Sequence, residues 1–151
     1  MEGHCKQVEE KFSMLLSLLK QLPSRFEMIA DEIDNEQLKH ALCAVAVETG
    51  QYAFELKQQF KRFDITLPKA REYHVDEFIS TEEGLEVIHG NGREIALICE
   101  RCEAFFSALY LSLLNDYFPN NLLKDMMQYQ LTGIRSAFFR IRFLNSLRFS
   151  N

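Results

Sequence analysis

With 151 residues, a formal net charge of −5 and 47% hydrophobic residues, this chain is long enough for one domain with a substantial core. Intrinsic disorder is excluded as the main state, because the apolar content is normal and charges of both signs are interspersed. A nucleic-acid-binding protein is also excluded, since an acidic chain without a Lys/Arg cluster cannot neutralise the phosphates of the nucleic-acid backbone. We therefore expect a single domain over residues 1–151.

Cysteine usage and hydropathy indicate the compartment. Cys5, Cys43, Cys99 and Cys102 show no disulfide-framework spacing, which favours a reducing environment. The first residues lack the basic and apolar regions of a signal peptide. The longest apolar run, 104–114, is shorter than the roughly 20 residues needed to cross a bilayer. We expect a cytoplasmic protein without a membrane partner.

The first predicted helix covers residues 7–33. Apolar residues recur every three or four positions on one stripe, namely Leu15, Leu18, Leu19, Leu22, Phe26, Ile29 and Ile33. Pro23 lies inside this pattern, and because it removes a backbone donor, we expect a kink near residues 20–22 or two helices in series.

The second predicted helix covers residues 35–63, with Asp34 as its N-cap and Gln37 reaching back as in a capping box. Its core-facing stripe consists of Leu38, Leu42, Val45, Thr49, Tyr52, Leu56, Phe60 and Phe63. Residues 64–91 then form a long crossover, in which the Ser80–Glu83 segment has the capping pattern of a short helix.

The third predicted helix covers residues 92–115 and is apolar on two sides. Its main stripe is Ile95, Ile98, Cys102, Phe105, Leu109 and Leu113, and its second stripe is Ala96, Cys99, Phe106 and Tyr110. The fourth covers residues 121–147 and turns Leu123, Met127, Gln130, Ile134, Ala137, Ile141 and Leu144 inward. No window shows the alternation of a β-strand.

Four long amphipathic helices predict an all-α four-helix bundle. The connection between the second and third helices is long for simple antiparallel neighbours. It can travel the length of the bundle, so these two helices are expected to run parallel. One long crossover of this kind is the ferritin-like topology.

Several segments resemble small bacterial ferritin-like four-helix-bundle proteins of unknown function. The matching residues are Leu18-Leu19-Lys20, Phe26 to Ile33, Leu38-Lys39, Glu48, Tyr52 to Leu56, Cys99-Glu100-Arg101-Cys102-Glu103 and Arg140 to Leu144. The chain departs from the family at three positions. Phe138 and Phe139 stand where the family has His and Asp, and Cys102 stands where it has Gly.

A di-metal centre in such a bundle needs a Glu from two helices and Glu-x-x-His from the other two. Glu48, Glu100 and Glu103 are the candidate ligands, but Glu48 is followed by Gln51 instead of His, and the fourth helix has neither Glu nor His. The histidines are scattered at His4, His40, His74 and His89. We therefore expect no metal and no cofactor, with Glu48 and Glu103 paired to Arg135, Arg140 or a tyrosine hydroxyl.

No catalytic constellation is found, since Gly-x-Ser-x-Gly, a phosphate-binding Gly-rich loop and a Cys–His pair are all absent. Cys99 and Cys102 lie inside a helix and not at its N-terminus, so we interpret them as small core residues. Gln130 is expected to be a buried structural amide, and Tyr52 and Tyr110 to reach the polar edge of the core with their hydroxyls.

The fourth helix carries more large apolar residues than its inward stripe can bury. Phe138, Phe139, Phe143 and the interleaved Arg142 are candidates for an interface, since aromatic residues and Arg are enriched at interface cores. We expect a homodimer through the helices at 92–115 and 121–147.

The favoured function is a non-catalytic bundle that binds itself or another protein. The alternatives are a di-metal protein that handles iron or peroxide, and a bundle that binds a small apolar ligand.

Overall fold

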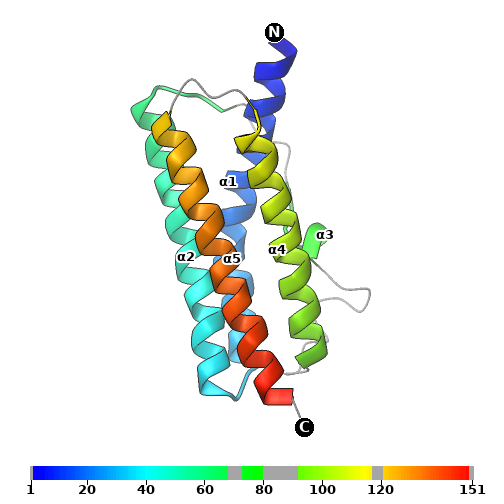
Figure 1. Cartoon of the computed structure of the whole chain (residues 1–151). Helices are drawn as coiled ribbons and strands as arrows, with labels where there is room; N and C mark the ends of the chain where they lie inside the picture. Colours follow the sequence, from blue (N-terminus) through cyan, green and yellow to red (C-terminus); the bar gives the residue numbers. More distant parts are fainter. Residues whose placement is uncertain (1, 68–72, 80–91, 117–120, 150–151) are drawn as a thin grey trace.

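The computed structural model is all-helical over the residues that it describes, which are 2–67, 73–79, 92–116 and 121–149, with side chains described for 6–67, 73–78, 94–116 and 121–147. Four long helices form a bundle and a short one covers its side (Figure 1). The helices are α1 (Glu2–Asp31), α2 (Glu36–Arg62), α3 (Asp76–Ile79), α4 (Gly92–Leu114) and α5 (Asn121–Phe149). The bounds of α2, α4 and α5 agree with the predicted ones to within two residues, whereas α1 begins five residues and ends two residues earlier than predicted.

The long helices run in two directions (Figure 1): α1 and α5 descend, while α2 and α4 ascend. Side-chain contacts agree with this arrangement. Phe12 of α1 packs edge-on against Phe60 near the end of α2, with ring centroids 5.2 Å apart. Lys11 forms an ion pair of 3.2 Å with Asp116, just beyond α4. The helices form a ring in which α1 packs on α2, α2 on α5, α5 on α4, and α4 on α1.

Helix α1 continues through Pro23 as one helix, so of the two expected alternatives, a kink or two helices in series, the second does not occur. The N-cap of α2 also differs from the prediction, because Asn35 and not Asp34 holds this position. The Asn35 side-chain oxygen accepts a hydrogen bond of 2.9 Å from the Leu38 backbone N–H. Asp and Asn are about equally good caps, so residue type alone could not choose between two adjacent positions.

The predicted stripes of α1 and α2 are buried, except for Phe63, which is exposed at the C-terminal end of α2. In α4 the outcome is mixed. Phe106 and Tyr110 of the second stripe are fully buried, whereas Phe105 and Leu109 of the main stripe are half-buried. Phe105 lies under α3, with its ring centroid 4.4 Å from that of Phe78. The side of α4 that faces away from the bundle centre is thus partly covered by the connecting segment.

The described part of the crossover is anchored to α1. Gln21 donates from Nε2 to the Tyr73 carbonyl at 2.6 Å and accepts from the Val75 N–H at 2.9 Å. Arg25 forms an ion pair with Asp76. Helix α3 was not predicted, and the short helix that was predicted at residues 80–83 lies outside the described residues.

None of the helices in the described ranges is both long and apolar enough to cross a membrane.

Ile98→Ala tests the orientation of α4. Ile98 is buried and Glu100, two residues further on, is exposed. Truncating Ile98 should therefore lower the free energy of unfolding by about 2–5 kcal/mol through cavity formation. Glu100→Ala is the matched control and should change it by less than about 0.5 kcal/mol. Denaturant unfolding followed by circular dichroism measures both, and a larger loss at Glu100 would contradict the orientation.

Candidate functional site

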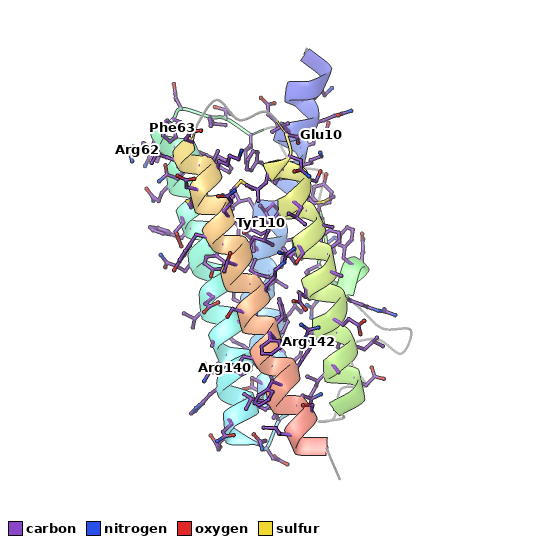
Figure 2. All side chains as sticks on the ribbon, viewed as in Figure 1. Glu10, Arg62, Phe63, Tyr110, Arg140 and Arg142 are labelled. Atoms are coloured by element: carbon purple, nitrogen blue, oxygen red, sulfur yellow. The ribbon has the colours of Figure 1, made fainter. Side chains whose placement is uncertain are left out.

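Gln130 of α5 lies at the centre of a buried polar cluster. It falls on the inward stripe of its helix and its side chain is fully buried, as predicted. Its Oε1 accepts a hydrogen bond of 2.7 Å from the Tyr110 hydroxyl, and its Nε2 donates at 3.3 Å to the Tyr52 backbone carbonyl. One amide therefore connects α5 to both α4 and α2. Figure 2 shows Tyr110 among the helices in the upper half of the bundle.

The Tyr110 hydroxyl does not reach the polar edge of the core, contrary to the prediction. Burial raises the pKa of this phenol well above its ordinary value, with a smaller contribution from Tyr52. The neutral hydroxyl is therefore a permanent donor to Gln130 at physiological pH.

The Tyr52 side chain lies on the contact between α2 and α5. Its hydroxyl lies near Glu48, one turn earlier on α2, and each of the two groups influences the pKa of the other. The hydroxyl oxygen also stands 1.9 Å from the point that a Cβ on Gly133 would occupy. Gly133 therefore provides the space in which the tyrosine packs against the α5 backbone. The sequence analysis did not identify this role of Gly133, because an isolated glycine in a helix gives no information on which side chain packs against it.

The Glu48 carboxyl group is half-buried beside Tyr52. Burial raises its pKa above the ordinary value, and the neighbouring Tyr52 hydroxyl and the positive charge of Arg140 counteract this effect in part. Its Oε2 has no hydrogen-bond partner among the described residues. Tyr52 is the phenol beside this carboxyl group, and the expected pairing of Glu48 with a tyrosine hydroxyl stays a prediction.

Glu103 of α4 forms an ion pair of 2.9 Å with Arg142 of α5. The prediction named Arg135, Arg140 or a tyrosine as its partner and was wrong on this point. Arg135 instead donates from Nε to the Ser107 hydroxyl at 3.3 Å. Arg142 points toward α4, and this direction depends on the rotation of α5 against its neighbours.

Cys99 and Cys102 are free, fully buried thiols. Burial raises the pKa of Cys99 to about 12, although the charge of Arg142 acts in the opposite direction. The pKa of Cys102 is also raised by burial. The thiolate is the form of cysteine that reacts and binds metals, and the raised pKa values disfavour it here. We therefore interpret both cysteines as core residues.

The three candidate metal ligands are not brought together. Glu48 lies beside Tyr52 on α2, Glu100 is exposed, and Glu103 is paired to Arg142. The described part of the chain contains no cluster of three or more His, Cys, Asp or Glu side chains that could hold a metal ion. His40 and His74 are exposed, and the side chains of His4 and His89 lie outside the described ones. This donor set does not fit a carboxylate-bridged di-metal centre.

The interface candidates fall into two groups. Phe138 is fully buried and packs against Phe26 of α1, with ring centroids 5.6 Å apart, so its assignment to an interface was wrong. Phe139 and Phe143 are 63% and 53% exposed, and their rings stack nearly parallel with centroids 6.5 Å apart. Leu147, one turn further on, is 57% exposed.

Gly133→Ala should destabilise the protein by about 1–3 kcal/mol, because the new methyl group meets the Tyr52 hydroxyl. Gly50→Ala is the matched control. Its Cβ would be in ordinary contact, 3.4 Å from Pro23 Cγ, so the better helix propensity should stabilise α2 by up to about 1 kcal/mol. Denaturant unfolding measures both. If Tyr52→Phe does not reduce the cost of Gly133→Ala in a double-mutant cycle, the hydroxyl is not the cause.

Glu48→Gln should stabilise the protein more at pH 7 than at pH 4. The folded state holds the Glu48 proton more tightly than the unfolded state, because its pKa is raised above 4.5. The wild-type protein therefore loses stability as the pH rises from 4.5 through the raised pKa, and glutamine does not titrate. Urea unfolding of both proteins at the two pH values measures the difference, and a difference that is constant or shrinks with pH would contradict the assignment.

Comparison with known proteins identifies the fold and no activity. A hypothetical protein from Pyrococcus furiosus has a similar solved structure, with a TM-score of 0.68 and 17% sequence identity over 93% of this chain and 89% of that chain. No protein-family model and no curated protein matches the sequence. At this identity the similarity shows a shared helical fold alone.

Proposed function

We propose that this chain is a ferritin-like helical bundle that acts by protein association, first of all with a second copy of itself, and not by catalysis. The ferritin-like assignment is supported by the parallel course of α2 and α4, each of which is antiparallel to α5 (Figure 1). The long connection between α2 and α4 agrees with such a topology.

The interior supports a structural role for the polar groups. Gln130 is satisfied by Tyr110 and Tyr52, and Glu103 is satisfied by Arg142. Each of these groups has a protein partner that fixes one helix against another. Such an arrangement favours a packed scaffold over a site that opens to a substrate.

The observation that carries the proposal is the exposed stack of Phe139 and Phe143 with Leu147 on α5. Contiguous large apolar side chains on the surface mark places of protein association. Full burial of a fully exposed phenylalanine contributes about 1.5–3 kcal/mol, and Phe139 and Phe143, which are 63% and 53% exposed, would gain roughly half of that. Burial of this α5 surface against a partner would therefore be favourable.

Light scattering at micromolar concentration tests the proposal. The wild-type protein should have twice the 17.7 kDa mass of the chain, and the double variant Phe139→Ser, Phe143→Ser should have the single mass. Phe54→Ser is the matched control, because Phe54 is equally exposed but lies on α2, and it should keep the double mass.

Two results would contradict the proposal. The first is a wild-type mass of 17.7 kDa that the two serine substitutions leave unchanged. The second is purified protein that carries about two metal ions per chain and loses them in Glu48→Ala and Glu103→Ala variants, because the bundle would then be a metal protein.

A further inference from the structure

A strap of the chain, residues 73–79, connects α1 to α4 and includes α3, which lies beside α4 (Figure 1). Gln21 of α1 binds the backbone of this strap with both ends of its amide. Its Nε2 donates to the Tyr73 carbonyl at 2.6 Å, and its Oε1 accepts a hydrogen bond of 2.9 Å from the Val75 N–H. A single side chain therefore supplies two of the hydrogen bonds that hold the strap on α1.

The remaining contacts of the strap are small in area or exposed to solvent. Arg25 of α1 forms an ion pair with Asp76, but each side chain is 35% exposed, and ion pairs at such exposure contribute little to stability. Among the side chains described for the strap, Val75 alone is buried. Phe78 is half-buried and packs against Phe105 of α4, with ring centroids 4.4 Å apart.

These contacts make the strap less stable than the helices that it covers. Helix α3 has four residues, too few for a helix that is stable without its neighbours. A segment with few buried apolar contacts also opens at a lower free energy than the core of the same domain. The four long helices, in contrast, share one continuous apolar core.

A buried thiol lies next to the strap contact on α4. Cys102 is fully buried and precedes Phe105 by three residues, which turns it by about 60° around the helix axis. Cys99 precedes Cys102 by a further three residues and therefore lies about 120° from Phe105. The charge of Arg142 of α5 acts on Cys99, so this second thiol lies toward α5. Cys102 is thus the thiol closer to the strap.

We propose that the strap opens and closes while the four long helices stay folded, and that its opening gives solvent access to the Cys102 side of α4. Opening separates the strap from Gln21 and removes the Phe78 ring from Phe105. The reactivity of the Cys102 thiol then depends on the position of the strap. The inference concerns α1 and α4 and is independent of the proposed association through α5.

Thiol labelling under native conditions tests the proposal. The folded protein is treated with N-ethylmaleimide for increasing times, quenched, denatured and digested with trypsin. Cleavage after Arg101 places Cys99 and Cys102 on different peptides, so mass spectrometry measures the two labelling rates in one sample. When opening and closing are fast relative to labelling, the rate at Cys102 reports the population of the open strap.

Gln21→Ala removes both hydrogen bonds to the strap and leaves a good helix former in α1. Labelling of Cys102 should become about tenfold faster, whereas labelling of Cys99 should change by less than about twofold. Phe78→Ala removes the attachment to α4 and should also accelerate labelling of Cys102. Lys11→Ala is the matched control, because it breaks an ion pair of α1 ten residues before Gln21, and it should leave both rates unchanged.

Three results would overturn the proposal. The first is an unchanged Cys102 rate in both strap variants while circular dichroism shows that they are folded. The second is equal acceleration at Cys99 and Cys102, because α4 would then open as a whole. The third is an acceleration that equals the loss of global stability in denaturant unfolding, since Cys102 would then react only through complete unfolding.

Discussion

The Gln130 amide restricts how the helices can be arranged around it. A buried amide left without partners costs about 1–3 kcal/mol, a large part of the stability of a domain. Its two partners lie on different helices, the Tyr110 hydroxyl on α4 and the Tyr52 carbonyl on α2. Both bonds form at one axial register of α5 against its neighbours. An apolar residue at this position would pack equally well at several registers, so the polar group adds specificity to the bundle.

This register also sets what lies around Tyr52. With α5 held by Gln130, Gly133 comes opposite the Tyr52 side chain one turn further along α5, and the Tyr52 hydroxyl lies near Glu48. The partly buried carboxyl group is then fixed at the contact between α2 and α5, which raises its pKa. The buried polar groups around Gln130 therefore help to fix how α2, α4 and α5 pack against one another.

Two adjacent phenylalanines on α5 lie in different environments, one in the core and one on the surface. Phe138 fills the core against Phe26, and Phe139 stacks with Phe143 on the surface. Adjacent residues on a helix point about 100° apart, so the two side chains have unrelated surroundings. One adds to the apolar core, and the other adds apolar surface.

Periodicity alone predicted the four long helices and most of their buried stripes, because a period of 3.6 residues is a local property of the chain. It also predicted that Gln130 is buried. The partners of the polar groups could not be predicted in the same way. Arg142 and not Arg135 or Arg140 pairs with Glu103, and Phe138 is inside while Phe139 is outside. These outcomes depend on the rotation of α5 by a few tens of degrees about its own axis. Packing against α2 and α4 sets that rotation, and tertiary structure alone decides it.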